Sequence, residues 1–179
     1  LTPDEFANGA AEAIKTGILD DEALFSLFEA GDVRMKISEI VAQCVAFKAR
    51  VVEEDETETG IRKTLNLGHT AGHAIERCSD FTIPHGHAVA VGLAIISRAA
   101  EALGWAETPI AGRVEAALAR NGLPITTDFT PEALAQAALS DKKRAGRTIT
   151  LVVPKKIGDC TLVDIPVEQL LDVFRAGMG

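Results

Sequence analysis

The chain has 179 residues, of which 47% are hydrophobic and 25% are charged, so it is long enough to bury one hydrophobic core. Its 26 acidic residues outnumber the 18 basic ones, which argues against nucleic acid or an anionic membrane surface as a partner. No apolar run reaches membrane-spanning length, no basic-then-apolar leader is present, and the three cysteines are widely spaced and read as reduced thiols, so we expect a cytoplasmic protein.

The first expected helix starts at residues 2–5, where Thr-Pro-Asp-Glu has the form of a capping box with proline at the first helical position. We expect this helix to end near Gly17. Glu12 and Lys15 lie three residues apart in it, a spacing that is typical of an exposed helical ion pair. On spacing alone, this pair would be ordinary surface.

Two more helices are expected before the middle of the chain. Asp20 is placed to cap a short helix that ends at Gly31, and apolar residues at helical spacing predict a long helix over residues 33–52. An acidic run, residues 53–58, then indicates a solvated turn, and Asn66 is a candidate N-cap for the helix that follows.

Residues 84–103 are apolar on nearly every side, which predicts a central buried helix that Gly104 ends. After it the pattern stays helical until residue 147, where it changes to the alternation of strands. The remaining expected elements are helices opened by Thr108-Pro109 and Thr130-Pro131, strands at 147–153 and 159–163 joined as a hairpin, and a last helix at 164–177.

All four histidines of the chain fall within residues 65–92. His69 and His73 are four residues apart, which places both imidazoles on one face of a helix. His85 and His87 follow Pro84 in the first turn of the next helix. Because imidazole is the commonest metal ligand and titrates near neutral pH, the cluster indicates a metal site, an acid–base site or both. For His87, a plain role at the helix terminus is an equal alternative.

Six short sequence words occur along the chain in a fixed order and spacing. They are E-A-I-K (residues 12–15), K-A-R-V-V (48–52), D-E-T-E-T-G-I-R (55–62), L-N-L-G-H-T-A-G-H-A-I-E (65–76), P-H-G-H-A-V-A-V-G (84–92) and D-K-K (141–143). In this arrangement the chain resembles the 3-dehydroquinate synthase family over essentially its whole length. The resemblance covers only the helical C-terminal half of that enzyme.

The resemblance implies a mainly α fold: one helical metal- and substrate-binding domain over residues 1–179, with a small β-hairpin near residues 147–163. In the family this domain is paired with an N-terminal NAD-binding α/β domain, which is not in this sequence. The complete enzyme is expected to be a cytoplasmic homodimer. The isolated chain is expected to be inactive without its N-terminal half.

The resemblance also implies roles for particular residues. Glu12, His69 and His85 would bind a divalent metal, Zn²⁺ or Co²⁺, with His73 nearby but not ligating. Two histidines and one carboxylate are a sensible donor set for a catalytic metal with open positions. The residues implied to face the substrate are Lys15, Lys48, Arg62, Asn66, His73, Lys142 and Lys143.

The activity implied is that of a lyase of the shikimate pathway. It is the NAD- and metal-dependent conversion of 3-deoxy-D-arabino-heptulosonate 7-phosphate to 3-dehydroquinate and phosphate. A cluster of cations in an acidic protein suits such a substrate, because the substrate carries both a carboxylate and a phosphate.

One position departs from the family pattern: His87 stands where the family usually has glutamate. If that glutamate supports the metal, the site could be tuned differently here. Three other readings stay open. They are another sugar-phosphate cyclase, a metal-dependent polyol or glycerol-phosphate dehydrogenase, and a non-catalytic helical module that only binds a partner.

Overall fold

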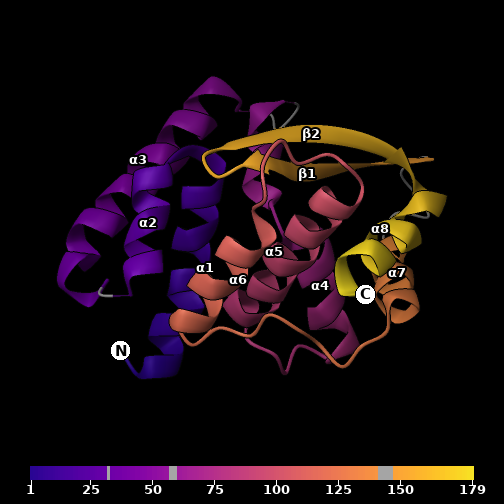
Figure 1. Cartoon of the computed structure of the whole chain (residues 1–179), viewed down its shortest axis with the longest axis horizontal. Helices are drawn as coiled ribbons and strands as arrows, with labels where there is room; N and C mark the ends of the chain where they lie inside the picture. Colours follow the sequence, from indigo (N-terminus) through magenta and orange to yellow (C-terminus); the bar gives the residue numbers. More distant parts are fainter. Residues whose placement is uncertain (32, 57–59, 141–146) are drawn as a thin grey trace.

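The structure, a computed structural model, describes residues 1–31, 33–56, 60–140 and 147–179. In these residues it is a helical body with one two-stranded antiparallel sheet laid across one end (Figure 1), which confirms the mainly helical fold class. Every helix found there is too short or too polar to cross a membrane. The elements are α1 (Pro3–Asp20), α2 (Glu22–Ala30), η1 (Arg34–Lys36), α3 (Ile37–Glu54), η2 (Ile61–Asn66), α4 (His69–Cys78), α5 (His85–Ala102), α6 (Ala111–Arg120), α7 (Pro131–Leu139), β1 (Thr148–Lys156), β2 (Asp159–Pro166), η4 (Val167–Gln169) and α8 (Leu170–Met178).

Helix α5 lies at the centre of the body, as its apolar sequence predicts (Figure 1). Helices α1, α4, α6 and α8 contact it, and β1 adds a further contact. Leu93 and Ile95 on this helix are among the largest fully buried side chains. Burying a side chain of this size stabilises the fold by about 1.5–3 kcal/mol. The first turn of α5, which carries His85, is therefore anchored by the main core.

The start of α4 packs directly against the backbone of α5. A Cβ atom at Gly92 would overlap the carbonyl oxygen of Gly68, so only glycine allows the two backbones to approach this closely. Gly68 has a φ of 76°, a conformation that L side chains rarely adopt, and it packs on Leu93. This contact brings His69, the next residue after Gly68, close to α5.

The capping box at the start of α1 is confirmed. The Thr2 hydroxyl accepts a hydrogen bond from the Glu5 N–H at 3.2 Å, and the Glu5 carboxylate accepts one from the Thr2 N–H at 2.7 Å. The predicted end near Gly17 is wrong, because α1 continues to Asp20. Gly17 is buried within the helix, where an added Cβ would lie 2.8 Å from the backbone nitrogen of Phe25. It permits close packing on α2 instead of ending the helix.

Two other predicted caps are displaced. Asp21, not Asp20, caps α2, and its carboxylate accepts hydrogen bonds from the first N–H groups of that helix. Helix α6 begins at Ala111, later than the expected start at Thr108-Pro109. Its first N–H groups are satisfied by the Glu101 carboxylate from the end of α5, a contact that the local sequence does not reveal.

The predicted hairpin is confirmed and is longer than expected. Thr148 pairs with Pro166 and Lys156 pairs with Asp159, so the turn is confined to Ile157-Gly158. The Gly158 N–H donates a hydrogen bond of 2.9 Å to the carbonyl oxygen of Ile18. The turn of the hairpin therefore caps the C-terminal end of α1.

Candidate active site

Three helices bring Glu12, His69 and His85 together. Glu12 lies in the middle of α1, whereas His69 and His85 are the first residues of α4 and α5. Oε1 of Glu12 is 3.8 Å from Nε2 of His69 and 3.6 Å from Nε2 of His85. One ligand atom from each residue lies within 4.8 Å of the others. The three residues that the resemblance assigns to a metal thus converge on one point.

Each imidazole has its other ring nitrogen occupied. Nδ1 of His69 is 3.0 Å from the carbonyl oxygen of Leu67, and Nδ1 of His85 is 2.9 Å from Oε1 of Glu76. A carbonyl oxygen accepts hydrogen bonds and cannot donate them, and the same holds for an ionised carboxylate. Nδ1 is therefore the protonated nitrogen in each neutral ring, and both Nε2 lone pairs are free to face Glu12.

The two carboxylate oxygens of Glu12 have different surroundings. Oε2 accepts a hydrogen bond of 2.7 Å from the Lys15 ammonium, which also donates to the carbonyl oxygen of Leu65 at 2.8 Å. Oε1 is buried and has no hydrogen-bond partner among the residues that the structure describes. Lys15 is only 6% exposed, so the prediction of an ordinary exposed ion pair is wrong. The lysine is buried by contact with Leu65, which is far from it in sequence.

The site favours a charged carboxylate beside neutral imidazoles. Burial raises the pKa of Glu12, but Lys15 and the two histidines outweigh it, so the pKa lies below its usual value. Burial, followed by the charge of Lys15, lowers the pKa of His69 to about 4. Burial also lowers the pKa of His73. At neutral pH these are the protonation states in which such groups bind metals.

The donor set fits a divalent cation. Ligand atoms held tetrahedrally at about 2.0–2.1 Å from Zn²⁺ are about 3.3 Å apart, slightly closer than the separations of Glu12 Oε1 from the two Nε2 atoms. A buried carboxylate oxygen without a partner is costly unless something binds it. A cation bound between the three atoms would remove that cost.

His73 lies one turn further along α4. Its ring centroid is 5.2 Å from that of His69 and 6.1 Å from that of His85. It belongs to a second possible ligand group with Glu76 and His85. His73 is thus beside the first cluster without being part of it.

Two cavities open onto this cluster. The α1–α3 cleft has a volume of about 580 Å³ and is lined by Glu12, Lys15, Lys48, His69 and His85 together with an apolar wall from α3. The α4–α7 cavity has a volume of about 270 Å³ and is lined by residues of α4 and α7, with Asn66 and Thr150. Asn66 and His69 line both, so the two cavities meet at the histidines.

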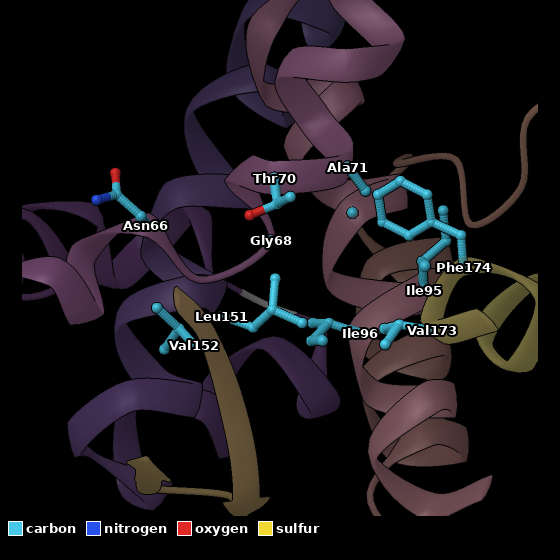
Figure 2. A pocket seen from close by; sticks show the side chains of 11 residues that line it. Asn66, Gly68, Thr70, Ala71, Ile95, Ile96, Leu151, Val152, Val173 and Phe174 are labelled. Carbon is cyan, nitrogen blue, oxygen red and sulfur yellow. The ribbon is translucent and has the colours of Figure 1, made fainter. Parts of the chain in front are cut away.

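A third cavity lies behind the site and is too small for a substrate. Figure 2 shows the apolar side chains of Ile95, Ile96 and Leu151 around it, with Thr70 close by and Asn66 at its far edge. Its volume of about 20 Å³ is enough for about one water molecule. The two cavities that open onto the cluster are more than ten times larger.

The residues expected to face the substrate do not all reach these cavities. Lys48, Asn66 and His73 do, and Lys15 does with its ammonium already bound to Glu12 and the Leu65 carbonyl. Arg62 is not among the residues that line either one, and its guanidinium donates to the Glu56 carbonyl oxygen at 2.9 Å. Lys142 and Lys143 lie outside the described residues.

The predicted N-cap of α4 is wrong. Asn66 ends η2, and Gly68 occupies the N-cap position without a side-chain cap. Leu67 and Gly68, which lie between η2 and α4, form a turn that the left-handed conformation of Gly68 makes possible. This turn leaves Asn66 at the meeting point of the two cavities.

A comparison with known protein families decides what kind of protein this is. The family profile described as 3-dehydroquinate synthase C-terminal matches residues 9–144. The chain belongs to the 3-dehydroquinate synthase family.

Named relatives agree with this assignment. The 3-dehydroquinate synthase of Pelobacter propionicus is 41% identical over 175 residues, a match that covers 93% of this chain and 49% of the relative. That of Pyrococcus furiosus is 39% identical over 173 residues and covers 96% of this chain and 51% of the relative. The chain thus spans about half the length of these synthases.

Solved structures show the same fold at lower identity. The 2-epi-5-epi-valiolone synthase ValA from Streptomyces hygroscopicus subsp. jinggangensis 5008, with NAD⁺ and Zn²⁺ bound, has a TM-score of 0.84 and 24% identity, over 99% of this chain and 52% of that one. A 2-deoxy-scyllo-inosose synthase complexed with carbaglucose-6-phosphate, NAD⁺ and Co²⁺ has a TM-score of 0.77 and 18% identity, over 98% of this chain and 52% of that one. At these identities the likeness concerns the fold.

The histidine that departs from the synthase pattern points away from the cluster. Nε2 of His87 is 3.4 Å from Oδ1 of Asp4 in the first turn of α1, and its Nδ1 is buried with no partner among the described side chains and backbone. His87 thus contacts the start of α1, while His85 in the same turn faces Glu12.

Sequence reasoning missed two parts of this synthase-like site. Glu76 accepts a hydrogen bond from His85, and the signal for it in the sequence was its place at the end of the word L-N-L-G-H-T-A-G-H-A-I-E, three residues after His73. Cys44 lines the α1–α3 cleft with the apolar residues of α3, where the helical spacing had indicated only core packing.

Proposed function

We propose that this chain is the metal- and substrate-binding part of a 3-dehydroquinate synthase. The complete enzyme would convert 3-deoxy-D-arabino-heptulosonate 7-phosphate to 3-dehydroquinate and phosphate. The observation that carries the proposal is the convergence of Glu12, His69 and His85. Oε1 of Glu12 faces both Nε2 atoms and has no hydrogen-bond partner in the described part of the chain. Membership of the synthase family supports the choice of reaction.

Glu12, His69 and His85 would hold the metal, which we propose is Zn²⁺ or Co²⁺. Both ions are named in solved structures of this fold. A divalent cation there would supply Lewis-acid stabilisation of negative charge on a substrate oxygen. The three side chains are suited to binding it, since burial and the charge of Lys15 lower the pKa of His69, and Lys15 lowers the pKa of Glu12 despite its burial.

The residues around the cluster would bind and orient an anionic substrate. Lys48 brings a positive charge to the α1–α3 cleft, and Asn66 and His73 bring hydrogen-bonding groups to the α4–α7 cavity. The chain as a whole has a net charge of −8, so a cation kept in a cavity beside a metal site indicates an anionic ligand. Arg62, Lys142 and Lys143 remain predicted members of this pocket.

NAD⁺ would be bound mainly by an N-terminal half that is not in this chain. The relatives are about twice as long as the matched segment, and the sheet described here is an antiparallel pair unlike the parallel sheets that usually bind dinucleotides. We further propose that the complete enzyme is a carbon–oxygen lyase that works in the cytoplasm as a homodimer. The free cysteines Cys44, Cys78 and Cys160 suit a reducing compartment.

The test is reconstitution. Phosphate release would be measured with the heptulosonate phosphate, NAD⁺ and Co²⁺ or Zn²⁺, first for this chain alone and then with a separately produced N-terminal NAD-binding half. We expect turnover only from the mixture, because the chemistry requires two bound reactants held together. The matched control is the same mixture made with His69→Ala, which should be inactive.

The same mixture, followed by NADH formation, by turnover of other substrates and by metal binding, separates the other candidate functions. Net NADH formation from a polyol or glycerol phosphate would identify a dehydrogenase. Turnover of a different seven-carbon or hexose phosphate, but not of the heptulosonate, would identify another sugar-phosphate cyclase. A mixture that binds no metal and turns over no substrate would leave a non-catalytic module and would overturn the proposal.

A further inference from the structure

Glu76 makes a contact that no role assigned so far explains. It lies on α4, its side chain is 13% exposed, and its Oε1 is 2.9 Å from Nδ1 of His85. His85 is the first residue of α5 and comes nine residues later. The hydrogen bond therefore links the last part of α4 to the first residue of α5.

We propose that Glu76 is a positioning residue: it holds His85 in the tautomer and orientation that direct Nε2 at Glu12. This inference rests on the proposed metal site, since it concerns how one of the three ligands is presented. A carboxylate that accepts from Nδ1–H fixes the proton on that nitrogen and also increases the basicity of the ring. Glu76 would thereby raise the affinity of the site for a divalent cation without touching the cation.

His85 needs such a partner more than His69 does. The side chain of His69 is 12% exposed, and its Nδ1 is held by the carbonyl oxygen of Leu67, only two residues before it. The side chain of His85 is 44% exposed, so surrounding atoms restrict its rotation less. The ring of His85 also meets the ring of His69 edge-on, with 5.3 Å between the centroids. Among the described residues, Glu76 supplies the hydrogen bond to Nδ1 of His85. Losing Glu76 should thus free the His85 ring.

Glu76 could instead be a metal ligand, because His73, Glu76 and His85 also bring ligand atoms within 4.8 Å of one another. The geometry favours the hydrogen bond. The Oε1–Nδ1 separation of 2.9 Å is an ordinary hydrogen-bond length, shorter than the separation of about 3.3 Å for two ligands on a tetrahedral cation. Moreover, if both ring nitrogens of His85 bound cations, the ring would have to lose its last N–H proton.

The first test is spectroscopic and needs no metal. Nitrogen-15 NMR of the metal-free chain reports which nitrogen of each histidine carries the proton. We expect His85 to be protonated on Nδ1 in the wild type, and to shift toward the Nε2–H form in Glu76→Ala. Glu115→Ala is the matched control, because Glu115 also makes a partly buried hydrogen bond, to Arg98, far from the histidines in sequence.

The second test is metal affinity, measured by titration with Zn²⁺ and by the visible spectrum of bound Co²⁺. Glu76→Ala should weaken binding by about 10- to 100-fold and alter the Co²⁺ spectrum. Glu76→Gln keeps the length and an acceptor oxygen, so it should restore most of the affinity. Glu76→Asp keeps the charge but is too short to reach Nδ1, so it should behave like alanine. Glu115→Ala should lower stability and leave the affinity unchanged.

Either of two results would overturn the proposal. One is wild-type affinity and an unchanged tautomer in Glu76→Ala; the other is a second bound Zn²⁺ that needs both Glu76 and His73, which would make Glu76 a ligand. If Glu76→Ala does not fold, Glu76→Gln and Glu76→Asp decide between the same outcomes. None of these readouts requires turnover. The positioning role can therefore fail while the synthase assignment stands, and the reverse also holds.

Discussion

Glu12 and Lys15 form an ion pair that involves one oxygen of the Glu12 carboxylate and leaves the other directed at the histidines. Oε2 of Glu12 is 2.7 Å from the Lys15 ammonium, whereas Oε1 is buried, faces two histidines and has no hydrogen-bond partner within residues 1–31, 33–56, 60–140 and 147–179. The lysine fixes the carboxylate in place and keeps it charged. The ion pair with Lys15 therefore holds Oε1 of Glu12 in a charged carboxylate that faces the two histidines.

The first prediction concerns the stability of this pair. In the metal-free chain, Glu12→Ala should lower the free energy of unfolding by about 1–3 kcal/mol, because among the described residues it leaves the buried Lys15 ammonium with the Leu65 carbonyl as its single partner. Adding Lys15→Met should recover part of that loss. Urea unfolding in the presence of a chelator would measure both. If the two substitutions instead destabilise additively, the pair does not act as a unit.

The second prediction separates ligands from neighbours. Replacing Glu12, His69 or His85 with alanine should each weaken Zn²⁺ binding by on the order of 100-fold or more, since each removes one ligand from the same ion. His73→Ala is the matched control, one turn along α4 from His69, and should weaken it by less than about 10-fold. Calorimetric titration of the four variants gives the comparison. A large effect of His73→Ala would show that His73 is itself a ligand.

The third prediction concerns pH. His69 has a pKa of about 4 in the fold and 6.5 when unperturbed, so between these values the unfolded chain binds a proton that the folded chain does not. The contribution of the neutral His69 ring to the stability of the metal-free protein should be fully present above pH 6.5. It should be lost as the pH falls from there through 4, and the loss should be on the order of 3 kcal/mol. Unfolding midpoints of wild type and His69→Gln over this range would isolate the contribution. The variant should show a shallower decline; parallel curves would contradict the shift.

The fourth prediction concerns the close approach of α4 and α5. Gly92→Ala should destabilise the fold by about 1–3 kcal/mol or more, because its Cβ would overlap the Gly68 carbonyl oxygen. It should also weaken Zn²⁺ binding, since moving Gly68 moves His69. Gly112→Ala is the control: it lies in α6, no atom of the described residues is within 4 Å of the added Cβ, and it should stabilise by up to about 1 kcal/mol. Thermal unfolding should show a lower melting temperature for Gly92→Ala and a higher one for Gly112→Ala. Equal changes in melting temperature would mean that the packing at Gly92 can relax.

Features set by neighbouring residues could be predicted from the sequence. The Thr2–Glu5 capping box, the buried helix α5 and the hairpin all appear as expected, because caps, periodicity and turn residues act over a few positions. The wrong predictions arise where contact with another segment of the chain determines the local structure. Gly17 looked like a helix stop but is buried against Phe25.

The candidate site shows the same division. Spacing along one helix placed His69 and His73 together, but it could not reveal that His85 and Glu12 arrive from two other helices; the family resemblance supplied those residues. The burial of Lys15 depends on the Leu65 carbonyl, 50 residues away in sequence. Such contacts depend on how helices pack, and no local pattern records them.

The capping of α1 by the hairpin has a consequence for the order of folding. The Cys160 thiol is 3.5 Å from the Ile18 carbonyl oxygen, although the two residues are 142 positions apart. Closing a chain loop of that length costs about 4 kcal/mol of entropy, so this contact cannot form early by itself. The helix that carries Glu12 should therefore keep a frayed end until most of the body has assembled. Metal ions added during refolding would then meet a complete set of ligands only in the last kinetic phase.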